Sequence, residues 1–467
     1  MDTVNTGDMS ELQSGKRKHP RGLYLLFITE MWERYSYYGM RSILVLYLTA
    51  ELISGGLGME KSQALMLYGL YTGLVYFTPL IGGYLTDRLM GLRTAITIGG
   101  ITMAAGDFTL FAVQAQWGLY LGLLFLIIGN GFFKPNISTL VGELYEKNDP
   151  RKDSAFTIFY MGINLGALFS PLIAGFLYAN LFHSTTGGVE VFGFKYAFLA
   201  SSIGMIIGQI TFNSLAKKYL GDIGTTPSSV KAIVDDKNEK KPLTKQEKDR
   251  TSVILILAVF VVIFWAGFEQ AGASFTLYTR DFIDRTVFGY EIPVSFFQSL
   301  NPLFILLLAP VVSALWIKLA RTKRGDFAIP TKMAFGLILL GLGFMVLIPA
   351  VMMTGSDEQN ITMKASMLFM VVTYLLHTLG ELSLYPIGLS LVSKMAPVKI
   401  ASLLMGAWFL SNAAANYVAG YVASLTTTFG YLEIFIYLGG AAIFLGLILL
   451  TISKKLQKLM HLDELAG

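Results

Sequence analysis

The chain contains twelve apolar segments, each long enough to cross a lipid bilayer as a helix. A spanning helix needs about 20 mainly apolar residues, because it must cover roughly 30 Å of hydrocarbon. Hydrophobic residues make up 54% of the 467 residues and charged residues only 14%, which excludes an ordinary soluble enzyme and favours one membrane-embedded body. The sequence predicts helices at residues 22–52, 63–89, 94–115, 118–144, 153–179 and 195–218, and then at 251–278, 294–320, 328–354, 362–392, 400–426 and 431–453.

A polar stretch separates the first six segments from the last six. Residues 219–250 include a charged run at 235–241 and few apolar side chains, so we interpret them as a cytoplasmic linker. Six helices, a linker and six more helices suggest two pseudo-symmetric halves, an arrangement in which transporters hold substrate at mid-membrane. The predicted domains are an N-terminal tail (1–21), a six-helix bundle (22–218), the linker (219–250), a second six-helix bundle (251–453) and a C-terminal tail (454–467).

The positions of the basic residues predict the orientation of the chain in the membrane. Of the 36 Lys and Arg residues, all but eight fall in the two tails or in the loops on the same side of the membrane as the tails. The exceptions are Arg34, Arg41, Lys61, Lys134, Lys195, Arg280, Arg285 and Lys364. Cytoplasmic loops carry an excess of Lys and Arg, so both termini are expected in the cytoplasm of a multi-pass protein of the cell membrane.

Composition and motifs exclude several classes of chemistry. The chain has no Cys, so disulfides and thiolate catalysis are excluded, and its 4 His residues disfavour most metal sites. It contains neither HExxH nor GxSxG, which argues against a membrane-embedded hydrolase or acyltransferase. The net charge of +5 follows from the orientation and is no sign of a nucleic-acid partner. We therefore expect a protein that is not an enzyme and has no cofactor or metal.

Ionisable residues inside the predicted spans carry the strongest functional signal, because each costs about 2.5–3.5 kcal/mol at a helix centre. The first span has a polar face within roughly 140° of the helix circumference, formed by Glu30, Glu33, Arg34, Tyr37, Tyr38 and Arg41. Three later spans contribute Lys134, Glu269 and Glu381. Buried ion pairs stabilise weakly, so a set this large indicates a water-filled cavity more than helix packing.

The charges in this set do not cancel. Three cations face four carboxylates, which leaves one carboxylate without a cationic partner if all are ionised. One proton would neutralise the set, and we hypothesise that this proton couples transport to a pH gradient. Asp107 lies in the third span and has no explanation from the sequence. His377, one turn before Glu381, is better explained as a packed neutral histidine than as a group sharing its proton.

Short motifs in both halves resemble those of a known family. Residues 83–93 resemble the GxLxDRxGRR loop of the major facilitator superfamily, with one extra residue before the second glycine. Residues 30–39 resemble the ExxERFxYYG signature of its proton-dependent oligopeptide transporter family, with Tyr35 where Phe is usual. Further segments that resemble this family are 129–136, 159–166, 264–270 and 380–382. The resemblance implies an all-α membrane protein with the major facilitator fold, twelve transmembrane helices in two pseudo-symmetric six-helix bundles.

The same resemblance implies symport of di- and tripeptides with protons by alternating access. By analogy with the family, the peptide carboxylate would be held by Arg34, Lys134 and Tyr38, and the peptide amino group by Asn164, Asn301 and Glu381. The peptide backbone would contact Tyr37 and Tyr76, and pockets for its side chains would be shaped by Trp265 and Trp408. Two gates would be formed by Arg41 with Glu269, and by Lys134 with Glu381 or the carboxylates of Glu30 and Glu33.

Alternatives to these roles remain open from the residues alone. Asn164 and Asn301 could simply join neighbouring helices, and Trp265 and Trp408 could be core or interface anchors. A related transporter of another small substrate, such as nitrate or a drug-like peptidomimetic, or a peptide receptor without transport would share part of the pattern. The expected partners are peptides, protons and membrane lipid, and a monomer is the expected functional unit.

Overall fold

The computed structural model describes residues 18–146, 149–227, 243–322, 325, 327–355, 361, 363–397 and 400–461. Side chains are not described for 385–394 and 401–402. The first half consists of six long helices, which are α2 (Arg21–Thr49), α3 (Lys61–Leu89), α4 (Leu92–Ala112), α5 (Gln116–Glu143), α6 (Lys152–Phe176) and α7 (Phe194–Leu220). Its shorter elements are η1 (Leu52–Ser54), η2 (Leu177–Leu181) and the hairpin of β1 (Ser184–Thr186) and β2 (Val189–Val191).

The second half also crosses six times, but less regularly. Its first crossing is α8 (Lys245–Phe268), which continues through the single turn η4 (Glu269–Gly272) into α9 (Ser274–Phe282). The other crossings are η5 (Val294–Ser299) with α10 (Leu300–Ala320), α11 (Ile329–Thr354), α12 (Leu368–Met395), α13 (Ala401–Ser424) with α14 (Thr426–Phe429), and α15 (Tyr431–Leu459). Short strands join the loops as the pairs β3 (Ile283–Asp284) with β6 (Ala365–Ser366), and β4 (Thr286–Val287) with β5 (Tyr290–Glu291).

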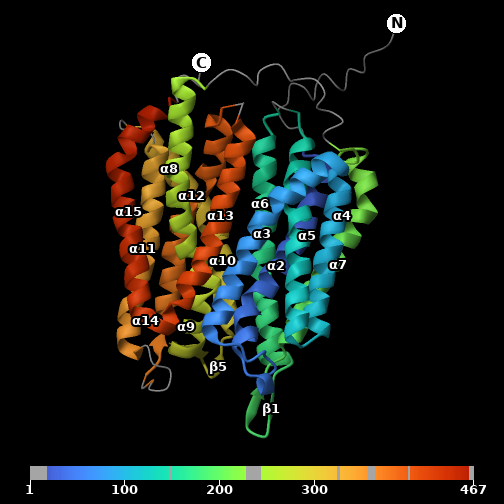
Figure 1. Ribbon diagram of the computed structural model, residues 1–467, viewed down its shortest axis with the longest axis vertical. Coiled ribbons are helices and arrows are strands. Elements are labelled where there is room, and N and C mark those ends of the chain that lie inside the picture. Colours follow the sequence, from blue (N-terminus) through green and yellow to red (C-terminus); the bar gives the residue numbers. More distant parts are fainter. Residues whose placement is uncertain are drawn as a thin grey trace.

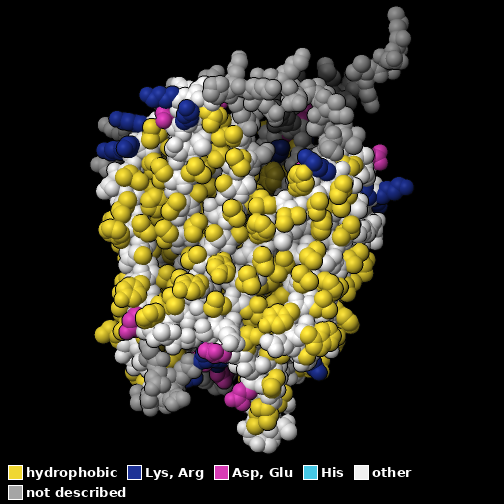
Figure 2. Space-filling view, in the orientation of Figure 1, with side chains coloured by type: hydrophobic (Ala, Val, Ile, Leu, Met, Phe, Trp, Pro, Cys, Tyr) yellow, Lys and Arg dark blue, Asp and Glu magenta, His cyan; other side chains and the backbone are white. Residues whose placement is uncertain are grey.

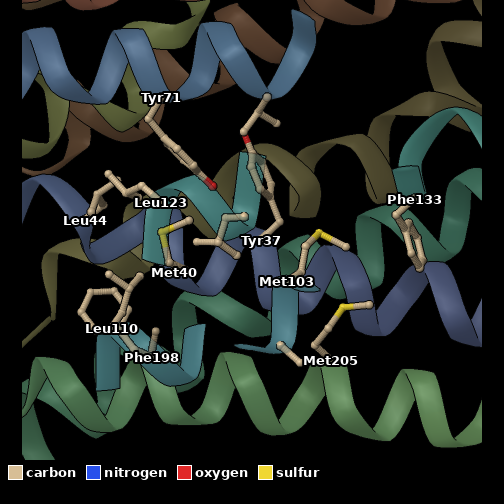
Figure 3. Packing of buried hydrophobic residues seen from close by; sticks show 14 of the residues in the cluster. Tyr37, Met40, Leu44, Tyr71, Met103, Leu110, Leu123, Phe133, Phe198 and Met205 are labelled. Atoms are coloured by element: carbon tan, nitrogen blue, oxygen red, sulfur yellow. The ribbon is translucent and has the colours of Figure 1, made fainter. Parts of the chain in front are cut away.

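Each half has its own hydrophobic core, so the molecule consists of two six-helix bundles side by side (Figure 1). The core of the first bundle comes almost entirely from α2–α7, and the core of the second from α8–α15. Figure 3 shows Met40 of α2 among the buried side chains of the first core, which include Leu110, Leu123 and Phe198. The predicted twelve-helix, two-bundle fold is confirmed.

The bundles touch along α3 and α13, where two glycines bring the backbones together. A Cβ atom added to Gly69 would lie 2.6 Å from the Cα atom of Gly420, so neither position has room for a side chain. On the other side of the interface, Gly175 of α6 faces Ser295 and Phe296 of η5 in the same way. These close approaches position the polar faces of the two bundles toward each other.

The two ends of the molecule differ. We call the end with Arg21 and Leu459 the terminal end and the end with β1 and β2 the hairpin end (Figure 1). At the hairpin end, side chains tie the bundles together: Arg280 donates to Thr49 at 2.9 Å and Lys61 forms an ion pair with Asp281 at 3.1 Å. Toward the terminal end, Figure 2 shows a hollow between the bundles. The interface is therefore closed at one end and hollowed at the other.

The outer surface suits a bilayer. Among the described residues, nine helices are long and apolar enough to cross a membrane. α2 is not one of them, because Glu30, Glu33, Arg34 and Arg41 interrupt its apolar sequence. Figure 2 shows apolar side chains covering the middle of the visible face, with charged side chains gathered near the two ends.

Several predicted boundaries were wrong for local reasons. The helix predicted at 22–52 ends at Thr49, because the chain turns through η1 to Gly55, whose φ is 81°. The helix predicted at 362–392 begins at Leu368, because Ala365 and Ser366 pair with β3 as a strand. α8 begins at Lys245, six residues before the predicted 251, because Thr244 and Glu247 form a capping box there. The domain division stays a prediction, since residues 1–17 and 228–242 lie outside the described residues.

Candidate functional site

Arg34 binds both glutamates of the polar face of α2. Its guanidinium donates from Nη2 to Glu33 Oε1 at 2.6 Å and from Nε to Glu33 Oε2, and its Nε lies 3.1 Å from Glu30 Oε1. All three side chains are buried, with Glu33 at 0% exposure. A planar guanidinium can bind two carboxylates at once, so the single positive charge of Arg34 is shared by Glu30 and Glu33. Glu30 Oε2 nevertheless has no hydrogen-bond partner among the described residues.

Lys134 lies close to this cluster but binds an aromatic ring. Its Nζ is 3.7 Å from the ring centroid of Tyr76 on α3, a cation–π contact. The expected ion pair of Lys134 with Glu381, or with the glutamates of α2, is not among the ion pairs of the described residues. That expectation therefore does not hold in this conformation, and the ammonium group is free of any described carboxylate.

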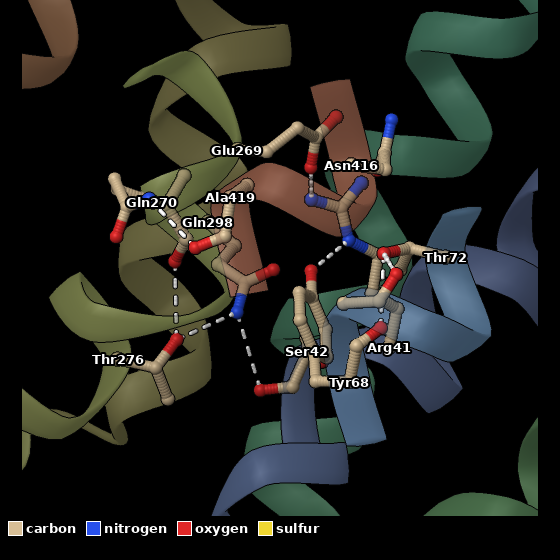
Figure 4. Close-up of polar contacts among 12 residues, drawn as sticks. Arg41, Ser42, Tyr68, Thr72, Glu269, Gln270, Thr276, Gln298, Asn416 and Ala419 are labelled. Atoms are coloured by element: carbon tan, nitrogen blue, oxygen red, sulfur yellow. Dashed lines mark hydrogen bonds and ion pairs between the residues drawn. The ribbon is translucent and has the colours of Figure 1, made fainter. Parts of the chain in front are cut away.

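The predicted pair of Arg41 with Glu269 is present. Arg41 of α2 makes an ion pair with Glu269 and donates from Nε to the hydroxyl of Tyr68 at 2.5 Å (Figure 4). Glu269 lies at the start of η4, where the crossing of α8 and α9 tightens into a single turn and directs the carboxylate across the interface. Next to it, Gln298 of η5 donates to the backbone oxygen of Ser42 at 3.3 Å, a further contact between the bundles.

Glu381 of α12 has a polar environment of its own. Asn301 of α10 donates from Nδ2 to Glu381 Oε2 at 2.7 Å and to Thr378 Oγ1 at 3.1 Å. Glu381 is 7% exposed, and among the described residues it has no cationic partner. Two residues expected to hold the same peptide group are thus brought together by the fold, within the second bundle.

The aromatic residues of the predicted site fall into two groups, one in each bundle. Tyr37 and Tyr38 are in edge contact, with ring centroids 5.2 Å apart, and the Arg41 guanidinium lies about 6 Å from both rings. Trp265 of α8 contacts Phe268 with ring centroids 5.1 Å apart, while Trp408 of α13 is buried in the core of the second bundle. Trp408 therefore also fulfils the packing role that its residue type alone suggests.

Asn164 and two groups left unexplained by the sequence lie apart from these contacts. Asn164 of α6 is buried and donates to the backbone oxygen of Tyr160 at 2.9 Å, one turn earlier on its own helix. Asp107 accepts a 2.6 Å hydrogen bond from Ser36, so it faces a side of α2 roughly 120° or more from Glu30. His377 is packed among the rings of Phe268, Phe275 and Phe344, as expected for a core histidine.

Three polar residues of the site were missed from the sequence, although each had a signal. Tyr68 lies two turns before Tyr76 on α3, so both share a helix face. Thr378 and Asn130 each lie one turn before a predicted residue, Glu381 and Lys134, and Asn130 donates to Glu33 at 3.4 Å. Helical spacing from a known site residue would have found all three.

The pattern of the POT family matches residues 93–220 and 213–433, most of both bundles. The chain belongs to the POT family. It is 36% identical to the uncharacterized transporter YclF of Bacillus subtilis, over 96% of both chains. It is 31% identical to a di-/tripeptide transporter of Lactococcus lactis, over 94% of this chain and 96% of the relative.

Solved structures agree with this assignment. A crystal structure of a mutant of peptide transporter POT in complex with alafosfalin has a TM-score of 0.84 to this POT-family chain. The two are 34% identical, and the match covers 98% of this chain and 100% of the other. The protein thus has the major facilitator fold of a membrane transporter and is not an enzyme.

Proposed function

We propose that this protein is a proton-coupled symporter that imports di- and tripeptides by alternating access. The observation that carries the proposal is that the two polar faces offer groups of opposite charge to a substrate between them. The first bundle presents Arg34 and Lys134, and the second presents Glu381 with Asn301. A short peptide is a zwitterion, so its carboxylate suits the first face and its amino group the second. The Lactococcus relative, named a di-/tripeptide transporter, and the alafosfalin complex support this substrate class.

Recognition of the backbone ends explains why varied peptides would be accepted. Charged groups on two bundles can hold the features that all short peptides share, while the peptide side chains lie between them. Tyr37, Tyr38 and Tyr76 would contact the peptide backbone, Asn164 would assist at its amino group, and Trp265 with Trp408 would shape the pockets for its side chains. Buried hydrogen bonds to charged groups contribute about 1.5–3 kcal/mol each, enough to select peptides over uncharged molecules of similar size.

The closed hairpin end defines the state in the transport cycle. With both termini in the cytoplasm of the cell (inner or plasma) membrane, the hairpin end faces outward and the hollow faces the cytoplasm. The Arg41–Glu269 pair then closes the outer side, and the molecule is inward-facing. Separation of this pair would open the outer side, and a new contact of Lys134 with a carboxylate would accompany closure of the inner side.

Proton coupling follows from the unbalanced charge. Arg41 is neutralised by Glu269, and Arg34 is shared between Glu30 and Glu33. When Arg41 and Glu269 separate to open the outer side, each becomes an uncompensated charge inside the membrane. Such a charge has a high free-energy cost. A proton on the glutamate lowers this cost. A membrane potential adds about 2.3 kcal/mol per charge per 100 mV to the driving force for proton entry.

Uptake by proteoliposomes tests the proposal. The purified monomer is reconstituted, an inward proton gradient is imposed, and labelled dialanine is measured inside the vesicles. We expect accumulation above the outside concentration that collapses on addition of a protonophore. Nitrate in place of dialanine serves as the control for another substrate class. Binding of dialanine without accumulation would show a receptor and contradict the proposal.

A further inference from the structure

A groove of about 270 Å³ opens on the outer surface of the first bundle, between the start of α2 and the end of α7. The α2 wall consists of Arg21, Tyr24, Leu25 and Ile28. The α7 wall consists of Thr211, Leu215 and Tyr219. The two helices touch beneath it, since a Cβ on Gly22 would lie 2.8 Å from a methyl carbon of Leu220. The groove is separate from the polar interface between the bundles, because Glu30 and Arg34 face away from it.

The shape of the groove suits one end of a long, thin molecule. The walls span eight residues of α2 (21–28) and nine of α7 (211–219), which is about 10–12 Å along the helices at 1.5 Å per residue. The volume falls just below the range of about 300–1,000 Å³ that encloses whole drug-sized ligands. Below Tyr24 the α2 wall is formed by Leu25 and Ile28, and Ile28 is 37% exposed on the lipid-facing surface. An acyl chain could therefore leave the groove along the helices into the bilayer.

The mouth of the groove is positively charged. Arg21 is exposed, and among the described residues it has no ion-pair partner. Lys218, in the last turn of α7, lies next to the groove, with its Nζ 5.5 Å from the ring centroid of Tyr219. α2 begins here without an acidic residue in its first turn and without a side-chain cap, so the positive end of its dipole is uncompensated. Tyr24 and Tyr219 lie at the same level, where tyrosines of membrane proteins contact lipid head groups.

We infer that this groove binds one anionic phospholipid, with the phosphate group at Arg21 and an acyl chain against Leu25, Ile28 and Leu215. Basic pockets between helices on the cytoplasmic side are typical sites for acidic head groups. The bound lipid would join α2, which carries Glu30, Glu33 and Arg34, to α7 within the same bundle. The site would thus hold the charged helix in place while the two bundles rock against each other.

Binding of phosphatidylglycerol to the full-length protein tests the inference. The protein is placed in nanodiscs of phosphatidylcholine with increasing phosphatidylglycerol, and retained lipid is measured by native mass spectrometry. Arg21→Gln removes the charge, and Leu215→Trp and Ile28→Trp each fill the groove. Lys454→Gln, an exposed basic residue on α15 of the other bundle, is the matched control. Thermal unfolding in phosphatidylcholine alone verifies that each variant is folded.

We expect retained phosphatidylglycerol in the wild type and Lys454→Gln, binding about fivefold weaker in Arg21→Gln, and none in a folded groove-filling variant. Equal binding in all variants would overturn the inference. Phosphatidylglycerol binding that is seen only after residues 1–17 are deleted would also overturn the inference, because it would mean that the tail occupies the groove in the intact protein. A changed oligomeric state in Leu215→Trp with unchanged lipid binding would assign the groove to a second copy and likewise overturn it.

Discussion

The two bundles share a fold but hold their buried charges differently. In the first bundle, Arg34 lies between Glu30 and Glu33 on one helix, so both carboxylates share a cation from their own helix. In the second bundle, Glu269 and Glu381 are buried, and neither has a cationic partner from its own bundle among the described residues. Glu269 is compensated only across the interface, by Arg41. The carboxylates of α2 thus have a cation on their own helix, whereas those of the second bundle have none in their own bundle among the described residues.

We infer from this difference that the two bundles have different roles in the transport cycle. The cluster of Arg34, Glu30 and Glu33 can stay together through every state, so we expect it to act as the fixed part of the site. Carboxylates without a cation of their own must receive a cation, a proton or the amino group of a peptide whenever the interface changes. The second bundle therefore carries the groups whose partners change during transport. Four substitutions test this division, in order of decreasing effect.

Arg34→Ala should have the largest effect, because it leaves Glu30 and Glu33 buried without a cation. Removing one member of a buried ion pair destabilises a protein by about 3–5 kcal/mol. We expect a much lower thermal unfolding temperature and no dialanine uptake. Arg34→Lys keeps the charge but loses the two-pronged geometry of the guanidinium. We expect this variant to fold but to transport dialanine poorly. Wild-type uptake by Arg34→Ala would show that Glu30 and Glu33 need no cation on their own helix, which would contradict this division.

Glu381→Gln should weaken peptide binding with little effect on folding. The amide can still accept the hydrogen bond from Asn301, but it cannot attract an ammonium group. A hydrogen bond to a charged group contributes about 1.5–3 kcal/mol, so we expect affinity for dialanine to fall about 10- to 100-fold. Equilibrium binding of labelled dialanine measures this. Glu433→Gln, an exposed carboxylate of α15, is the control and should bind as the wild type does. Unchanged affinity in Glu381→Gln would remove the residue from the site.

Tyr68→Phe should have an intermediate effect confined to the Arg41–Glu269 gate. It removes one hydrogen bond from the charged Arg41, and because Glu269 still holds the guanidinium we expect a loss of about 1.5 kcal/mol, the low end for a bond to a charged group. Since the chain has no Cys, a pair of introduced labels across the hairpin end can report how often it opens. We expect more frequent opening by about tenfold. Tyr47→Phe, whose hydroxyl has no partner among the described residues, should leave opening unchanged. Equal behaviour of both variants would contradict a role for Tyr68 at the gate.

Asp107→Asn should have the smallest effect. Asp107 is 0% exposed, accepts one hydrogen bond from Ser36, and has no cation among its described contacts, so a neutral side chain suits the position. We expect stability within about 1 kcal/mol of the wild type and normal uptake, whereas Asp107→Ala should cost about 1–3 kcal/mol. Thermal unfolding and uptake measure both. Loss of uptake in a folded Asp107→Asn would contradict this expectation and would show that the first bundle has a further functional carboxylate.

The sequence was sufficient for the helices and for the polar face of α2. Both follow from apolar length and from the 3.6-residue period, which are local properties of the chain. The irregular second half was not predictable in the same way. The turn at Glu269–Gly272 and the start of α12 after β6 depend on contacts with segments distant in sequence. Such contacts cannot be predicted from the hydropathy of the sequence.

The pairings within the site could be anticipated only in part. The family resemblance correctly implied the contact of Arg41 with Glu269, which is an ion pair in the structure. It did not anticipate that Lys134 lies over Tyr76, since a single sequence contains no information on which state of a gate is populated. Asp107 could not be assigned either, because its partner Ser36 lies on the back of α2 and has no spacing relation to it.

The coupling claim is tested most directly by Glu269→Gln in proteoliposomes, with peptide exchange and proton-driven accumulation measured on the same preparation. The amide cannot take up a proton, although it can still accept a hydrogen bond from Arg41. The account predicts that exchange of dialanine across the membrane continues while accumulation against a gradient is lost. Accumulation by Glu269→Gln that still follows the imposed pH gradient would contradict it.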